Sequence, residues 1–209
     1  MSSFYKYSIR IIVLLSLPLG EGWGGVAFGQ LLDSAAIYSA PIFNNLDEAL
    51  KTPNSVYRLS MRGKKLKVFP MEILKLKYLQ ELDLSKNKLD SIPNEIGELK
   101  NLQVLDLSSN KLEYLPDSIG KLKNLKKIAA GKNEILAIPK QIGELENLEI
   151  LDLWSNQIGV FPDELNKLKK LRWMDLRVIQ IDDPMQKHLQ ELLPKVIIHF
   201  SPSCHCVSG

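Results

Sequence analysis

Apolar residues recur along most of the chain in a fixed frame of 23 residues. Five leucines at that spacing mark it, namely Leu79, Leu102, Leu125, Leu148 and Leu171. Counted from Val56, the first five copies are apolar at every one of the offsets 0, 3, 5, 10, 13, 17 and 20, although hydrophobic residues make up only 45% of the chain. These columns fit neither an amphipathic helix nor a coiled coil, so the pattern predicts a stack of repeats.

Each copy opens with a short stretch in which apolar and polar residues alternate, as at Leu82 and Leu84. This alternation predicts a strand with every second side chain inward, and stacked copies predict one parallel sheet. An asparagine follows each strand in four copies, at Asn87, Asn110, Asn133 and Asn156. Because its side chain both donates and accepts, we expect it to bond the backbone of the turn that leaves the strand.

The second half of each copy predicts a short helical or irregular turn on the side away from the sheet. A proline begins this half in five copies, at Pro70, Pro93, Pro116, Pro139 and Pro162, where it fixes φ. Gly97, Gly120 and Gly143 fall where we expect the short helical turn to reverse, a place where glycine is favoured.

The stretch Leu79–Asn87 and its copies resemble the L-x-x-L-x-L-x-x-N-x-L signature of the leucine-rich-repeat family. The continuation I-P-x-x-I-G-x-L-x-N is similar to the family's 23-residue, Ile-Pro-containing subclass, found in Ras-group-related proteins and in bacterial exported proteins. The resemblance covers residues 56–193. It implies an α/β solenoid of about six repeats, with a curved parallel sheet on the concave face and short helical turns on the convex face.

The first 29 residues have the layout of a secretory signal peptide. Lys6 and Arg10 precede an apolar run over residues 11–19, and small residues at Ala27 and Gly29 favour cleavage after Gly29. The alternative is a membrane anchor, but the run is about half of the roughly 20 residues that a spanning helix needs. We therefore predict an exported protein, whether secreted, periplasmic or on the cell surface, with no membrane span in the mature chain.

The remaining segments flank the repeats. We expect residues 30–55 to form an N-terminal segment with a capping helix over Asn44–Leu50. Residues 194–209 are expected to form a C-terminal cap strand, at Val196–Phe200, and a tail. In that tail Cys204, His205 and Cys206 allow three interpretations, which are an unspecialised end, a disulfide or a metal site.

The composition adds little chemistry to this architecture. The chain of 209 residues holds 36 leucines but 3 His and 2 Cys, so few side chains are suited to metal or nucleophilic catalysis. The formal charge of +3 gives no strong case for a nucleic-acid partner. We find no Gly-rich phosphate loop, no H-E-x-x-H and no G-x-S-x-G. The sequence therefore predicts neither an enzyme nor a cofactor.

The outward positions of the last repeats predict a partner-binding site. Its residues are Ile150, Asp152, Trp154, Trp173, Asp175 and Arg177. We expect the isoleucine and the two tryptophans to lie close together, and two Trp with an Arg are typical of binding hot spots. The alternative is that the tryptophans cover the sheet edge or pack on the C-terminal segment.

Asp83, Asp106, Asp152 and Asp175 occupy equivalent outward positions. Such a row of carboxylates is either simply solvated or able to bind a cation or a basic partner. Together these features predict an exported interaction module that binds a protein partner through its concave face, with a glycan as the other ligand class. The alternative function is that of a structural, self-associating cell-surface scaffold.

Overall fold

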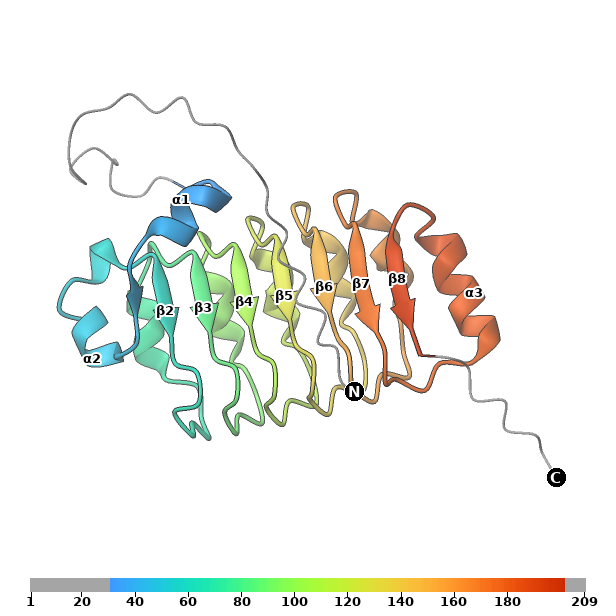
Figure 1. Cartoon of the computed structure of the whole chain (residues 1–209), viewed down its shortest axis with the longest axis horizontal. Coiled ribbons are helices and arrows are strands. Elements are labelled where there is room, and N and C mark those ends of the chain that lie inside the picture. Colours follow the sequence, from blue (N-terminus) through green and yellow to red (C-terminus); the bar gives the residue numbers. More distant parts are fainter. Residues whose placement is uncertain (1–30, 202–209) are drawn as a thin grey trace, which may run out of the picture. The chain divides into compact units, whose positions relative to one another are not determined.

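The computed structural model describes residues 31–201, which contain one parallel sheet of eight strands in chain order (Figure 1). The strands are β1 (Ile42–Phe43), β2 (Arg58–Ser60), β3 (Glu81–Asp83), β4 (Val104–Asp106), β5 (Lys127–Ala129), β6 (Ile150–Asp152), β7 (Trp173–Leu176) and β8 (Ile197–Phe200). The predicted signal peptide (residues 1–29) and the tail with Cys204, His205 and Cys206 lie outside the described residues.

The register of the sheet follows the 23-residue frame. Leu59 pairs with Leu82 and Leu82 with Leu105, so equivalent residues of successive copies stand side by side across the strands. The last pair departs from the frame by one residue, because Trp173 pairs with Ile197. The prediction of an α/β repeat solenoid with a parallel sheet is confirmed.

The opposite side of five successive repeats is a 3-10 helix of five residues. These turns are η2 (Met71–Lys75), η3 (Asn94–Glu98), η4 (Asp117–Lys121), η5 (Lys140–Glu144) and η6 (Asp163–Lys167). Each begins directly after one of the five predicted prolines, whose φ values lie between -67 and -78°. Because 3-10 helices occur in short pieces, these five-residue segments suit the sharp reversal of the chain in each of the five repeats.

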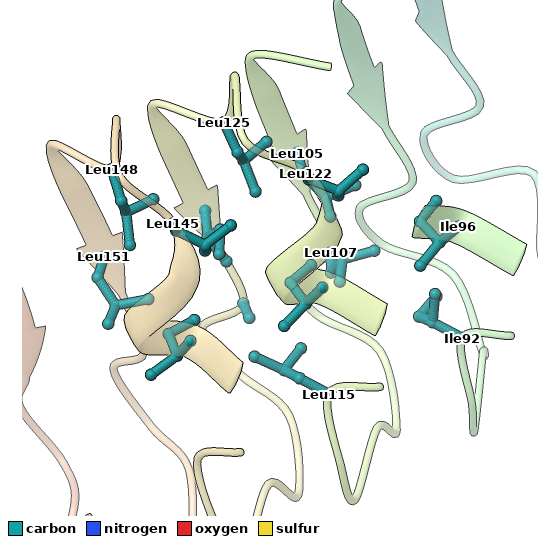
Figure 2. Packing of buried hydrophobic residues seen from close by; sticks show 14 of the residues in the cluster. Ile92, Ile96, Leu105, Leu107, Leu115, Leu122, Leu125, Leu145, Leu148 and Leu151 are labelled. Atoms are coloured by element: carbon teal, nitrogen blue, oxygen red, sulfur yellow. The ribbon is translucent and has the colours of Figure 1, made fainter. Parts of the chain in front are cut away.

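Leucine and isoleucine side chains fill the space between the sheet and the 3-10 turns. Leu105 and Leu151 point inward from β4 and β6, and Ile96 points inward from η3 (Figure 2). All three are buried without measurable exposure. Full burial of such a side chain stabilises the fold by about 1.5–3 kcal/mol, so the leucine columns supply the main stabilising term of the stack.

The asparagine column joins each turn to the one before it. Asn87 donates from Nδ2 to the carbonyl oxygens of Met61 (2.9 Å) and Leu84 (2.8 Å), and its Oδ1 accepts from the Leu66 amide (3.0 Å). Asn110, Asn133 and Asn156 repeat the arrangement. The buried backbone groups of the turn are thereby satisfied, as the sequence pattern predicts.

The residue before each asparagine, or at the equivalent place in the end repeats, has left-handed backbone. These residues are Gly63, Lys86, Ser109, Lys132, Ser155 and Val178, with φ between 55 and 68°. Most of these residues have long or polar side chains, which are compatible with the left-handed conformation. Val178 is the exception, because a β-branched residue at positive φ is a true outlier.

The prediction for Gly97, Gly120 and Gly143 is wrong in its physical reason. They lie inside η3, η4 and η5, and none of them has the positive φ that a reversal would need. Instead, a Cβ on Gly97 would stand 2.9 Å from the carbonyl oxygen of Ser118 in the next turn, and one on Gly120 would stand 2.6 Å from that of Gln141. Glycine is required here because adjacent turns pack backbone against backbone.

Two segments flank the repeats. Before them come α1 (Ser34–Ser39), β1, α2 (Leu46–Ala49) and η1 (Pro53–Ser55). Of these, the sequence pattern predicts the helix that contains α2 but neither α1 nor β1. The Asn45 side chain caps α2 by accepting from the amides of Asp47 and Glu48. After the last 3-10 turn, α3 (Asp183–Leu192) takes the place of a further 3-10 helix and leads into β8.

Candidate partner-binding surface

The face of the sheet that points away from the core carries three rows of side chains running across the strands. The first row is Ile42, Arg58, Glu81, Val104, Lys127, Ile150, Trp173 and Ile197. The second row is Ser60, Asp83, Asp106, Ala129, Asp152, Asp175 and His199. The third row, just beyond the strands, is Arg62, Ser85, Ser108, Gly131, Trp154 and Arg177.

The N-terminal end of this face is polar and internally paired. Arg58 is buried and donates to the Glu81 carboxylate from Nε (2.8 Å) and Nη2 (3.1 Å), and its Nη1 donates to the carbonyl oxygen of Tyr38. Arg62 donates from Nη1 to the hydroxyl of Ser85 at 2.6 Å. These cations therefore have partners within the chain.

Asp83 is likewise engaged. One of its oxygens accepts from the Ser60 hydroxyl at 3.2 Å, and the other accepts from the amide (2.8 Å) and the hydroxyl (2.6 Å) of Ser85. A carboxylate that already accepts three hydrogen bonds has little capacity left for a partner.

The C-terminal end of the first row is apolar. Ile150, Trp173 and Ile197 stand side by side on β6, β7 and β8. Ile197 is 63% exposed, and the other two are half-buried. The indole of Trp173 leans toward β8, where its ring centroid lies 5.6 Å from that of His199. The structure thus shows the packing on the C-terminal segment that was the alternative interpretation of this tryptophan.

Trp154 lies elsewhere, at the level of the third row. It leans in the other direction, toward β5, and its indole lies over Gly131 so closely that a Cβ on this glycine would collide with the ring. The ammonium of Lys132 stands 4.9 Å from the ring centroid. Since the first and third rows are four residues apart along a strand, or about 13 Å, the two tryptophans do not form one cluster. The structure brings Ile150 next to Trp173 but leaves Trp154 apart.

Asp175 and Arg177 neutralise one another. Asp175 is 1% exposed, and the Nε of Arg177 lies 2.9 and 3.0 Å from its two carboxylate oxygens. The Arg177 amide also donates to Asp175 at 3.0 Å. This hydrogen bonding to Asp175 raises the pKa of Arg177. The pair therefore presents a fixed guanidinium rather than a free negative charge.

Asp152 differs from its neighbours in the second row. It is half-buried, and it accepts from the Trp154 amide at 3.3 Å, but it forms no ion pair with any residue between 31 and 201. Burial raises the pKa of this carboxyl to about 6, against the lowering effect of the Trp154 hydrogen bond and with a further increase from Asp175. Asp152 is thus a partly desolvated carboxylate on the same face as the apolar Ile150 and Trp173, two residues along the strand from Ile150.

A family model described as a leucine-rich repeat region matches residues 71–198, more than half of the chain. The chain belongs to the leucine-rich-repeat family. No curated protein matches its sequence.

Solved structures of other leucine-rich-repeat proteins are similar to this member. A leucine-rich-repeat protein of Leptospira interrogans is 33% identical, with a TM-score of 0.64 over 78% of this chain and 48% of its own. Internalin C2 of Listeria monocytogenes is 26% identical, with a TM-score of 0.60 over 70% of this chain and 62% of its own. The PEPR1–AtPEP1 structure is 25% identical, with a TM-score of 0.54 over 63% of this chain and 19% of that one. This chain therefore spans less than two thirds of the length of each.

A second exposed apolar row of this leucine-rich-repeat chain was not predicted from the sequence. Tyr114, Ala137 and Val160 form successive parallel bridges at offset 12 of three copies, on the flank between the asparagine turns and the 3-10 helices. Tyr114, Val160 and the neighbouring Leu136 are exposed. The signal was in the sequence, because offset 12 also holds Val68, but the column is broken by Ser91.

Within residues 31–201, no group of three or more His, Cys, Asp or Glu side chains is placed to hold a metal ion. Among the helices in that same range, none has the length and apolar character needed to cross a membrane.

Proposed function

We propose that this leucine-rich-repeat chain is an exported module that binds a protein partner through the outer face of its sheet, without catalysis or a cofactor. The binding residues we propose are Ile150, Asp152, Trp154, Trp173, Asp175 and Arg177. The observation that carries the proposal is the apolar row of Ile150, Trp173 and Ile197, which stays accessible while the N-terminal half of the same face is occupied by internal hydrogen bonds.

The physical properties of this face suit binding. Its side chains stand on a sheet whose strands are locked by the leucine core, so little conformational freedom is lost when a partner docks. Trp and Arg are the residue types most enriched in binding hot spots, and Arg177 is held in place by Asp175. One of the similar structures is that of PEPR1–AtPEP1, which agrees with a binding role for the repeat.

Export is part of this proposal and rests on the layout of residues 1–29. Basic residues, a short apolar run and small residues near Gly29 follow one another as in a secretory signal peptide. Expression of the full chain in a bacterial host, followed by N-terminal sequencing of the exported product, tests this step. A mature protein that begins at or near Gln30 supports export, and an unprocessed cytoplasmic product contradicts it.

The binding proposal is tested by affinity capture from envelope and host-surface extracts, followed by a titration with the purified partner. We expect Trp173→Ala to weaken binding by about 2 kcal/mol, roughly 30-fold, and Trp154→Ala to weaken it less. The matched control is Tyr114→Ala on the flank, which removes an exposed ring of similar size. Thermal melts establish that each variant is folded. Unchanged affinity of the Trp154→Ala/Trp173→Ala double variant would contradict the site. Capture of a glycan instead of a protein would contradict the proposal that the partner is a protein.

A self-associating scaffold is the second candidate function. The observation that favours it is the exposed flank row of Tyr114, Leu136 and Val160, because exposed apolar patches commonly mark contact surfaces. Analytical ultracentrifugation over a range of concentrations tests this alternative. A concentration-dependent dimer that Tyr114→Ala abolishes supports the scaffold, whereas a monomer throughout excludes self-association by this row.

A further inference from the structure

The charge that a partner must carry at the proposed site follows from the contacts of Asp152. We infer that the bound segment of the partner carries an apolar side chain and, about 7 Å from it, a basic side chain. This inference rests on the proposed function. The apolar group covers Ile150 and Trp173, and the basic group pairs with the carboxylate of Asp152. In an extended segment this spacing corresponds to residues two apart.

The spacing comes from the strand itself. Ile150 and Asp152 lie two residues apart on β6 and both point outward, which places them about 6.6–6.8 Å apart along the sheet. Trp173 pairs with Ile150 on the neighbouring strand and widens the apolar contact. A segment that covers this pair therefore also covers Asp152.

The need for a cation follows from that covering. Any partner that removes water from Ile150 and Trp173 also removes water from a carboxylate that is already half-buried. A carboxylate that is buried without a partner must take up a proton, which costs free energy at neutral pH, whereas a charge-assisted hydrogen bond to a basic group keeps it ionised and adds to the binding. A wholly apolar or an acidic segment would leave Asp152 uncompensated.

Three of the other acidic groups of this face do not make the same demand. Glu81 is paired with Arg58, Asp83 accepts from Ser60 and Ser85, and Asp175 is neutralised by Arg177. Asp106 resembles Asp152, because it is half-buried, accepts from the Ser108 amide at 2.9 Å and forms no ion pair within residues 31–201. It lies two strands away on β4, however, so the carboxylate next to Ile150 and Trp173 that lacks a cation is Asp152. Lys127 acts on Asp152 through its charge without forming an ion pair with it.

The β5 side of Asp152 carries no second carboxylate. The second row holds Ala129 there, where the adjacent strands carry aspartates. A basic side chain whose aliphatic stem lies on Ile150 can therefore pair with Asp152 without competition from an acidic neighbour on that side.

The test is an NMR titration of the isotopically labelled protein with two peptides, acetyl-Ala-Leu-Ala-Arg-Ala-amide and the same peptide with citrulline in place of arginine. Citrulline keeps the shape of arginine and removes its charge. We expect both to perturb the Trp173 indole N–H signal, and the arginine peptide to bind about fivefold more tightly. Asp152→Asn should reduce this ratio to about one, while Glu95→Gln, on the exposed side of η3, should leave it unchanged.

Three results would overturn the inference. They are equal affinities for the two peptides, a ratio that persists in Asp152→Asn, and the failure of both peptides to perturb Trp173. None of these bears on the capture experiment with the Trp154→Ala/Trp173→Ala variant. If binding of a captured partner requires the tryptophans but the affinity for the arginine peptide does not depend on Asp152, the proposed function is supported and the inferred basic side chain is contradicted.

Discussion

The indole of Trp154 lies against Gly131, the equivalent residue of the preceding repeat. The two are 23 positions apart, and no side chain larger than a hydrogen atom fits beneath the ring, because a Cβ on Gly131 would collide with it. The ring is also approached by the Lys132 ammonium at 4.9 Å. The position of one tryptophan on the proposed binding face is therefore set by the residue type in another repeat.

Gly131→Ala is expected to displace the Trp154 indole into solvent without unfolding the chain. We expect a loss of about 1–3 kcal/mol in the free energy of unfolding and a shift of tryptophan emission to longer wavelength. The measurement uses a Trp23→Phe/Trp173→Phe background, so that Trp154 alone is observed. Gly159→Ala is the control, because a Cβ there meets nothing within 4 Å. An unshifted spectrum would show that the indole does not depend on Gly131.

Asn133→Ala should be strongly destabilising. Its Oδ1 accepts from the Leu112 amide at 3.1 Å, and its Nδ2 donates to the carbonyl oxygens of Leu107 and Ala130. Because these groups are buried, we expect a loss of about 2–4 kcal/mol in urea unfolding. Asn124→Ala removes a single exposed hydrogen bond, to the Lys100 carbonyl, and should cost less than about 1 kcal/mol. Equal losses in the two variants would argue against a structural role for the buried column.

Asp152→Asn should stabilise the protein at neutral pH and have little effect at low pH. The pKa of Asp152 is raised from an ordinary 3.8 to about 6, mainly by burial, so the folded state holds this proton more tightly than the unfolded state. Stability from this group is therefore present at low pH and is lost as pH rises from about 4 to 6. After solvent screening we expect a gain of about 1 kcal/mol for the variant at pH 7.5 and none at pH 4.

Urea unfolding of the wild type and of Asp152→Asn at the two pH values measures this difference. Because both proteins share every other titrating group, their subtraction isolates Asp152. Glu95→Gln, an exposed carboxyl on the 3-10 side, should give a pH-independent difference. A gain for Asp152→Asn that is the same at pH 4 and 7.5 would mean that the charge of Asp152 is not the cause.

Val178→Asn should raise the melting temperature. Val178 is 63% exposed, so little apolar burial is lost, and its φ of 59° is strained for a β-branched side chain but tolerable for asparagine. We expect a gain of about 1 kcal/mol. Val160→Asn is the control, since that valine is 59% exposed and has no left-handed backbone. A melting temperature that falls in both variants alike would remove strain as the explanation.

Much of the fold could be predicted from the sequence because one period governs every layer. The leucine columns set the register of the strands, the prolines start the 3-10 turns, and Asn87 and its equivalents occupy the expected buried turn. The short flanking elements have no such period. Ile42–Phe43 is a strand of two residues that is stabilised by pairing with β2, and nothing local distinguishes it from a loop.

The proposed site was harder to predict. The position of a residue in the repeat tells on which face of the sheet its side chain lies, but not toward which neighbouring strand the side chain leans. Trp154 turns toward β5 because Gly131 leaves space there, and Trp173 turns toward β8 because His199 stands beside it. The glycines of the 3-10 turns show the same limit. The pattern located Gly97 and Gly120, but only the distance between adjacent turns reveals that backbone contact excludes a side chain.

The common register of all three rows has a consequence for how this surface can change. Removing residues 125–147, one whole frame, would join Asn124 to Leu148 and keep every remaining row aligned. The sheet would lose β5, and the leucine and asparagine columns would close over the gap. The side chains that are neighbours on the outer face would change, because Trp154 would contact Ser108 instead of Gly131 and Asp106 would stand next to Asp152. Gain or loss of a frame thus produces a new binding face on an unaltered scaffold, without any point substitution.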